Sequence, residues 1–355
     1  MFRYEYEIGK ASTILTRDLL KLKQGETFII TADTESDPRV VDATASAAFA
    51  LGAKPMVIWL ASPLGVGKAA DSMLPLEPLT AALKKADAWV EFNNQWLLYS
   101  TPYDIAMKEN KKLRYMCLVG MNVDMMTRCI GRIDYSALKK FLGKIEEMTI
   151  NAKHIRLTTP AGEDVEFDNP KDENGEPDPN YPFDTSFGYA EEPGSHMMSG
   201  QIGWSPKLDS INGTIVFDGS LVPPCGKLEK PIVLTICAGE VVKIEGGKQA
   251  VEFENWLKSF KHPQMLKLAH VCYGFNPGAK LTGDILEDER IWGATEWGIG
   301  NVGPGLIKPN GISGPSHTDG ICLNTSVWLD DKQIMDKGKM IEPDLAKLAK
   351  KLGKL

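Results

Sequence analysis

The chain has 355 residues, of which 43% are hydrophobic and 25% are charged, and its formal net charge is −7. This length and apolar content can bury a large core and suffice for two domains. The acidic balance argues against a nucleic-acid or anionic-membrane partner, and the sequence holds no run of eighteen apolar residues. The charged amino-terminal segment has no signal-peptide core, so we expect a cytoplasmic protein.

Residues 1–148 alternate between helix-like and strand-like segments. The predicted strands are 27–31, 55–60, 88–92 and 115–119, and the predicted helices are about 10–22, 38–51, 79–85, a segment after Pro102, and 135–148. Ser36-Asp37-Pro38 and Ser100-Thr101-Pro102 each supply an N-cap residue and a proline, which is typical of a helix start. Such alternation indicates a parallel sheet with helices on both faces. We therefore predict a doubly wound, Rossmann-like α/β domain over residues 1–148.

Residues 149–355 differ in character. The polar, proline-rich stretch 168–182 is typical of a loop. Short strand-like segments follow at 213–217, 232–237 and 241–245, and one helix-like segment, 251–260, interrupts the β-rich pattern. The six cysteines form no C-x-x-C pair, which suits reduced thiols. These features predict a second, β-rich α+β domain, and the residues that we expect to bind a metal lie within it.

His317-Thr318-Asp319 lies in a glycine- and proline-rich stretch that leads into the strand-like run 321–329. In an extended segment a His and an Asp two residues apart point to the same side, so one strand can offer a metal two ligands. His270, which stands between apolar residues, is the best candidate for the third ligand. Two His and one carboxylate form the triad that binds Fe(II) and leaves coordination positions open. The alternative is a His that is hydrogen-bonded to a neighbouring carboxylate without any metal.

Two glycine-rich segments have features of nucleotide-binding motifs, but their context does not fit. Residues 298–303 have the spacing G-x-G-x-x-G, yet they lie in the β-rich half and lead into Pro304 rather than into a helix. Residues 65–68 lack the upstream glycine and the following Ser or Thr of a phosphate-binding loop. We expect neither segment to bind a nucleotide.

The chain also resembles a known family. The segments that carry the resemblance are 36–39, 187–194, 213–217, 269–278, 316–319 and 328–331. In the same order, they resemble segments of the 2,5-dihydroxypyridine 5,6-dioxygenase family, whose members are non-haem Fe(II) ring-cleaving enzymes and in turn resemble aminopeptidases of the T and S type. The resemblance implies one Fe(II) per chain bound by His270, His317 and Asp319, with Zn, Co or Mn as the alternative metal. It further implies a small-molecule substrate, dioxygen and a homodimer.

Further site residues follow from the same resemblance. His196 falls on a substrate-contacting His, and Glu192 lies where the aminopeptidases have a metal carboxylate. Glu296 is expected to be a fourth ligand or a base, or otherwise a surface carboxylate. The chain departs from the dioxygenase family at Ser186, where that family has an acidic substrate-binding residue, and at Tyr99, where it has a His. We therefore expect catalytic roles for His196, Glu296 and Tyr99, and substrate contacts from Ser186, Glu192, His196 and Tyr99.

These departures also bear on the reaction. An aminopeptidase-like metallohydrolase is the alternative activity, but His270 stands where the aminopeptidases have a metal-ligating Glu, and a dinuclear site needs bridging carboxylates. A metal-stabilised binding protein without turnover is a third interpretation. The expected activity is Fe(II)-dependent cleavage of a hydroxylated aromatic or heteroaromatic ring other than 2,5-dihydroxypyridine.

Overall fold

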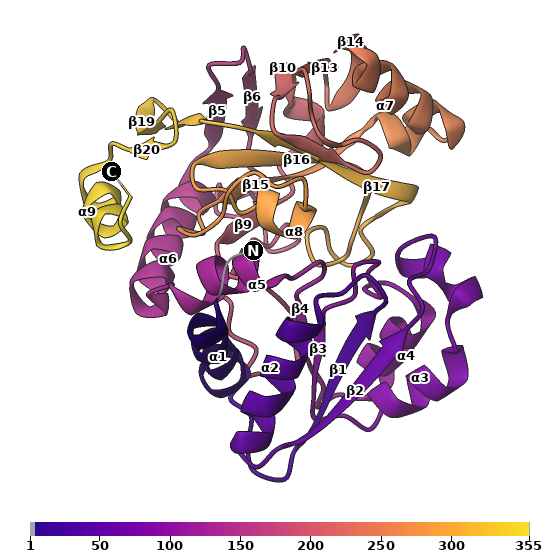
Figure 1. Ribbon diagram of the computed structural model, residues 1–355. Coiled ribbons are helices and arrows are strands. Elements are labelled where there is room, and N and C mark those ends of the chain that lie inside the picture. Colours follow the sequence, from indigo (N-terminus) through magenta and orange to yellow (C-terminus); the bar gives the residue numbers. More distant parts are fainter. Residues whose placement is uncertain (1–3, 355) are drawn as a thin grey trace. The chain divides into compact units, whose positions relative to one another are not determined.

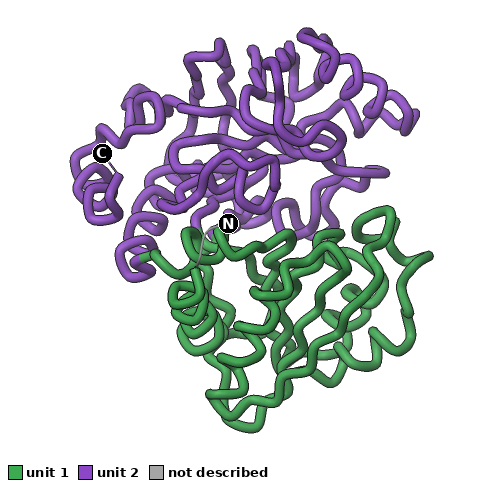
Figure 2. Tube along the Cα trace, in the orientation of Figure 1, with its two compact units in different colours: residues 1–133, 186–199 green, residues 134–185, 200–355 purple. Residues whose placement is uncertain are grey.

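The computed structural model of the protein describes residues 4–354 (Figure 1). The chain forms two compact units (Figure 2): unit 1 comprises residues 1–133 and 186–199, and unit 2 comprises residues 134–185 and 200–355. The boundary expected after residue 148 lies inside helix α6 (Tyr135–Asn151), which belongs as a whole to unit 2. Unit 1 includes a later segment of the chain because strand β8 (Gly194–Met197) joins its sheet.

Unit 1 is built on a five-stranded parallel sheet with the strand order β2-β1-β3-β4-β8. The first four strands in the chain are β1 (Thr27–Asp33), β2 (Lys54–Leu60), β3 (Ala88–Glu91) and β4 (Arg114–Cys117). Nearly every residue of β1, β3 and β4 is buried, as expected for strands that are covered on both faces. Figure 1 shows α1 and α2 on one side of this sheet and α3 and α4 on the other. The predicted doubly wound α/β architecture is confirmed.

Two helices of unit 1 begin at the caps that the sequence indicates. Asp37 accepts a hydrogen bond from the Arg39 N–H at the start of α2 (Pro38–Ala50), and Ser100 does the same for the Tyr103 N–H at the start of α4 (Thr101–Glu109). The remaining helical segments of the unit are α1 (Glu5–Thr13), η1 (Ile14–Leu19), η2 (Gly67–Met73), α3 (Leu76–Leu83), α5 (Val123–Met126) and η3 (Thr127–Gly131).

The loops that follow β1 and β3 are bonded to each other. The Gln95 N–H donates to the Asp33 carboxylate at 2.9 Å, and the Ser36 hydroxyl donates to the Phe92 carbonyl, also at 2.9 Å. The strand order reverses between β1 and β3, and doubly wound folds commonly bind ligands at such a point. In unit 1, these two hydrogen bonds between the loops span the position where the strand order reverses.

Unit 2 contains an eight-stranded sheet, β14-β13-β10-β6-β5-β18-β19-β20, and a seven-stranded sheet, β12-β11-β17-β16-β15-β9-β7. The strands are β5 (His154–Thr158), β6 (Asp164–Asp168), β7 (Asp184–Ser186), β9 (Gln201–Trp204), β10 (Asn212–Phe217), β11 (Ser220–Val222), β12 (Gly226–Lys227), β13 (Ile232–Cys237), β14 (Glu240–Gly246), β15 (Leu268–Gly274), β16 (Ala294–Val302), β17 (Ile312–Cys322), β18 (Ser326–Leu329), β19 (Lys332–Asp336) and β20 (Lys339–Met340). The helical segments besides α6 are η4 (Leu208–Ser210), α7 (Lys248–Ser259), η5 (Pro263–Leu266), α8 (Ile285–Asp288) and α9 (Pro343–Lys351). The predicted β-rich α+β domain is confirmed. Within residues 4–354, no helix has the length and apolar character needed to cross a bilayer.

Strand β16 has one face in the core and one face at the candidate site. The Trp297 ring is fully buried and lies edge-on to Phe167 of β6, with the centroids 5.5 Å apart, and its indole N–H donates to Glu163 at 3.0 Å. The eight-stranded sheet therefore packs on this face of β16. Because alternate residues of a strand point to opposite faces, Glu296 and Gly298 face away from that packing layer.

Candidate metal centre

His270, His317 and Asp319 lie on β15 and β17, the two strands that flank β16. The strand pairing sets His270 opposite Gly298 on one side of β16 and Asp319 opposite Gly298 on the other. Directly paired residues of antiparallel strands project from the same face of the sheet. His317 precedes Asp319 by two residues and so shares that face. The pairing thus gathers three potential ligands from two strands onto one surface.

Gly298 makes room for the His270 ring. A Cβ atom at position 298 would lie 2.3 Å from Cε1 and 2.4 Å from Nδ1 of His270, closer than such atoms can approach. The imidazole therefore occupies the space that a side chain on β16 would fill. The G-x-G-x-x-G segment, which we expected not to bind a nucleotide, includes this glycine and forms strand β16 over most of its length.

The candidate ligand atoms converge. His317 Nε2 lies 2.8 Å from Asp319 Oδ1, and His270 Nε2 lies 3.6 Å from the same oxygen. The two imidazole rings are stacked, with centroids 5.1 Å apart and an interplanar angle of 14°. One ligand atom from each of the three residues lies within 4.8 Å of the others. Such spacing suits a single cation, since metal bonds to nitrogen and oxygen are about 2.0–2.2 Å long.

The second nitrogen of His317 fixes its tautomer. Nδ1 lies 2.7 Å from the backbone carbonyl oxygen of Asn301. A carbonyl oxygen can only accept, so Nδ1 carries a proton, which leaves Nε2 as the ring nitrogen that can bind a metal. A backbone carbonyl on the far nitrogen is the usual support for a metal-binding imidazole.

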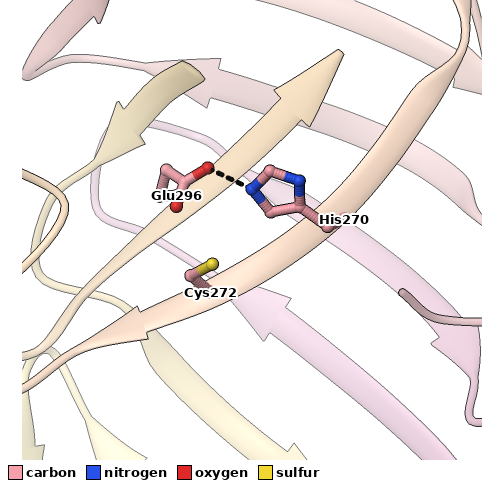
Figure 3. Close-up of side chains that lie close together, drawn as sticks. All are labelled: His270, Cys272 and Glu296. Carbon is pink, nitrogen blue, oxygen red and sulfur yellow. Dashed lines mark hydrogen bonds and ion pairs between the residues drawn. The ribbon is translucent and has the colours of Figure 1, made fainter. Parts of the chain in front are cut away.

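Glu296 and Cys272 extend the cluster on the same face (Figure 3). Glu296 Oε1 lies 2.8 Å from His270 Nε2, and Cys272 forms with these two residues the other group of potential metal ligands among the described residues. Burial raises the pKa of the Cys272 thiol well above its usual value. Because the thiolate is the form that binds metals, the set of two His and Asp319 is the better donor set.

The charges of the cluster favour an added cation. Burial would lower the pKa of His270, but the neighbouring Glu296 and Asp319 carboxylates raise it to about 9. Burial would raise the pKa of Glu296, yet the charge of His270 lowers it below its usual value. Burial raises the pKa of Asp319, although His317 opposes the shift. The Glu296 and Asp319 carboxylates therefore favour the protonated, cationic form of His270. A divalent ion bound by neutral imidazoles would supply the same positive charge. The donor set therefore fits a metal ion.

Comparisons with known proteins agree with the sequence resemblance. A sequence profile of the 2,5-dihydroxypyridine 5,6-dioxygenase family matches residues 16–342. The chain belongs to this family. It is 26% identical over 345 residues to the 2,5-dihydroxypyridine 5,6-dioxygenase of Pseudomonas putida, and the match covers 92% of this chain and 94% of that protein. The solved structure of 2,5-dihydroxypyridine dioxygenase from Pseudomonas putida KT2440 has a TM-score of 0.76 at 22% identity, covering 96% of this chain and 99% of that one.

The aminopeptidase likeness is a likeness of fold. Wild-type AmpT from Thermus thermophilus has a TM-score of 0.68 at 14% identity, with 96% of this chain and 100% of the AmpT chain covered. The sequence resemblance to the dioxygenase family is confirmed, and the resemblance to the aminopeptidases is confirmed at the level of the fold.

The eight site residues predicted for this member of the dioxygenase family divide between the units. His270, Glu296, His317 and Asp319 belong to unit 2 and share one sheet face, whereas the other four, Tyr99, Ser186, Glu192 and His196, belong to unit 1. Tyr99 is exposed, with φ +67°, and lies edge-on to Tyr103 at 5.9 Å. His196, on β8, donates from Nε2 to the Glu192 carbonyl at 2.8 Å. Ser186 is half-buried at the end of β7.

Three residues near Glu296, namely Gln201, Glu289 and Arg290, were not predicted from the sequence. Gln201 hydrogen-bonds to both Glu289 and Glu296, and Arg290 pairs with Glu289 at 2.7 Å. These residues come from β9 and from the segment after α8, and no spacing pattern connects them. The position of Gly298 could have been predicted from the sequence, because strand alternation in 294–302 places it on the same sheet face as Glu296.

Proposed function

We propose that this protein is an Fe(II)-dependent dioxygenase that cleaves the ring of a hydroxylated aromatic or heteroaromatic small molecule. The observation that carries the proposal is the convergence of His270, His317 and Asp319 on one sheet face, in a chain that belongs to a dioxygenase family. Two imidazoles and one carboxylate form the donor set of non-haem Fe(II) oxygenases, which leaves positions for substrate and dioxygen. One Fe(II) per chain, a homodimer and a cytoplasmic location are parts of the same proposal.

The residues of the cluster have distinct roles in this proposal. His270, His317 and Asp319 would hold the ion, His317 through its Nε2. The ion supplies Lewis acidity toward ring hydroxyl groups and electrons for oxygen chemistry. The Asn301 carbonyl keeps His317 in the binding tautomer. Glu296, whose carboxylate lies 2.8 Å from His270 Nε2 on the same sheet face, would accept the proton that a ring hydroxyl releases.

A metallohydrolase is the second candidate, and the carboxylates Glu289, Glu296 and Asp319 are the feature that favours it. A dinuclear hydrolytic site needs carboxylates that bridge two cations about 3.5–4 Å apart. In this chain Glu289 is already paired with Arg290 at 2.7 Å, and the His270 imidazole lies against both Glu296 and Asp319. A mononuclear centre therefore accounts better for the arrangement.

Oxygen uptake tests the proposal directly. Protein purified without oxygen and loaded with Fe(II) should consume dioxygen only when a dihydroxylated ring is present, and the ultraviolet absorption of the ring should disappear in step. Asp319→Ala should abolish this uptake. Asp168→Ala, which alters an exposed carboxylate bonded to His154, is the matched control and should leave it unchanged. No uptake across dihydroxypyridines and related diols by iron-loaded protein, or metal-dependent release of amino acids from peptides, would contradict the proposal.

The preferred ring is a further part of the proposal. Ser186 cannot supply the negative charge that the resemblance places at its position, and Tyr99 stands in place of an imidazole. A polar group without its partner can lower the rate on a substrate by orders of magnitude. We therefore expect 2,5-dihydroxypyridine to be a poor substrate, and Ser186→Glu combined with Tyr99→His to raise kcat/KM for it. A wild-type kcat/KM of about 10⁴ M⁻¹s⁻¹ or more on this ring would contradict that expectation.

A further inference from the structure

The side-chain amide of Gln201 lies between two carboxylates, the buried Glu296 and the partly buried Glu289, beside the candidate metal centre. Its Nε2 donates one hydrogen bond to Glu289 Oε2 and another, 3.2 Å long, to Glu296 Oε2. A primary amide nitrogen carries two hydrogens, so each carboxylate receives one. Gln201 begins β9, which pairs with β15, and the amide reaches Glu296 on β16 from that side.

Arg290 fixes the orientation of this amide. One terminal nitrogen of its guanidinium donates to Gln201 Oε1 at 3.0 Å, and the other donates to Glu289 Oε1 and to the Leu286 carbonyl, each at 2.7 Å. A guanidinium can only donate, so it binds the oxygen end of the amide and leaves the nitrogen end toward the carboxylates. The Arg290 side chain is 1% exposed, and buried charge-assisted hydrogen bonds of this kind are strong.

We infer that Gln201 is a positioning residue, which sets the orientation of Glu296 at the metal centre. With Oε2 bonded to Gln201, the other oxygen of Glu296 points at His270 Nε2, 2.8 Å away. Gln201 acts through Glu296, whereas the ion is held by the triad. The inference rests on the metal centre of the proposed function and goes beyond it, because it holds whatever ring the enzyme cleaves.

Metal affinity tests this role without any substrate. Gln201→Met keeps the length of the side chain and removes both amide hydrogen bonds. The metal-free variant should bind Co(II) about 10–100-fold more weakly than the wild-type chain in a chelator competition, the usual size of effect when a supporting hydrogen bond is lost. Gln249→Met is the matched control. It removes hydrogen bonds to the Lys227 carbonyl and from the Glu229 N–H elsewhere in unit 2, and the affinity should stay within about twofold.

A double variant separates positioning from a general effect on folding. In a Glu296→Leu background, Gln201→Met should change Co(II) affinity less than about twofold, because the group that it positions is gone. Gln201→Asn, whose amide is too short to bridge both carboxylates, should weaken binding as Gln201→Met does. An unchanged affinity in both single variants, or a full loss that persists in the Glu296→Leu background, would overturn the inference. Wild-type protein that binds Co(II) but consumes no oxygen when loaded with Fe(II) would contradict the proposed function alone.

Discussion

Each unit buries a glutamate, and the two side chains ionise differently. Glu91, at the end of β3 in unit 1, is fully buried and accepts hydrogen bonds from the Leu97 N–H and the Tyr115 hydroxyl. Burial raises its pKa to about 7 even though these donors oppose the shift. Glu296 in unit 2 is 1% exposed, and burial would raise its pKa as well, but the charge of His270 lowers it. Burial alone therefore does not decide how a carboxylate ionises, because a partner that can become cationic reverses the direction of the pKa shift.

The same contrast extends to the surroundings of the two glutamates. The carboxylates of Asp33 and Glu91 in unit 1 accept hydrogen bonds from backbone N–H groups of the loop that follows β3. In unit 2, Glu296 and Asp319 converge on imidazole nitrogens instead. Substitutions in the first set should therefore alter the free energy of unfolding, and substitutions in the second set should alter the affinity for an ion.

The largest effect is expected from His317→Ala. Loss of one of three ligands leaves too few to compete with water, so the affinity for Co(II) or Fe(II) should fall more than about 100-fold, beyond the effect of losing a supporting hydrogen bond. Chelator competition on protein purified without oxygen measures this. His154→Ala, at an exposed histidine paired with Asp168, is the control. If His317→Ala retained one metal ion per chain, His270, His317 and Asp319 could not be the metal-binding triad.

Glu91→Gln should change how the free energy of unfolding depends on pH. The folded-state pKa of about 7 exceeds the ordinary value of 4.5, so the folded state keeps a proton that the unfolded state has lost between these values. Its contribution to stability is present below pH 4.5 and is lost as the pH rises through 7, by about 3 kcal/mol. Urea unfolding of the metal-free chain at several pH values should show this loss in the wild type and not in the variant. If the free energy of unfolding had the same pH dependence in the wild type and in Glu91→Gln, the prediction would be wrong.

Gly298→Ala should have a smaller effect on the affinity for the ion. The new Cβ would lie 2.3 Å from the His270 ring and must displace it, and overpacking of this kind costs about 1–3 kcal/mol. We expect roughly a tenfold loss of Co(II) affinity, since about 1.4 kcal/mol corresponds to a factor of ten. Gly143→Ala in α6, where a Cβ meets no atom within 4 Å, is the control. Unchanged affinity in Gly298→Ala would show that the ring position does not matter for binding.

The smallest effect is expected from Ser36→Ala in unit 1. The Ser36 hydroxyl donates to the Phe92 carbonyl and accepts from the Asp33 N–H, each at 2.9 Å. Its removal should lower the free energy of unfolding by about 1 kcal/mol, the ordinary net contribution of a hydrogen bond. Co(II) affinity should stay within about twofold of the wild type. A large change in affinity would mean that the loops of unit 1 influence the ion, contrary to the contrast drawn between the two units.

Local signals made much of unit 1 predictable. Apolar strands that alternate with capped helices are visible in short windows of sequence, and α2 and α4 begin at the expected caps. Strand β8 was not predictable, because Gly194–Met197 has no apolar alternation and joins the sheet beside β4 from a distant part of the chain. The α/β alternation also continues into α6, so the sequence gives no sign that this helix belongs with unit 2.

The candidate site was predictable only in part. The two-residue spacing of His317 and Asp319 places both on one face of a strand, whatever the rest of the fold. The proximity of His270 depends on the pairing of β15 with β16, which is set by contacts remote in sequence. Gln201 and Arg290 meet because β9 and the segment after α8 pack together, and neither periodicity nor spacing encodes such packing.

Strands β15, β16 and β17 follow one another along the chain and lie side by side in the sheet. The backbone ladders set the register of the candidate ligands, while the connections 275–293 and 303–311 lie outside these three strands. Lengthening or shortening either connection would leave the ladders intact. The lengths of these connections can therefore vary without changing the register that sets His270 and Asp319 opposite Gly298.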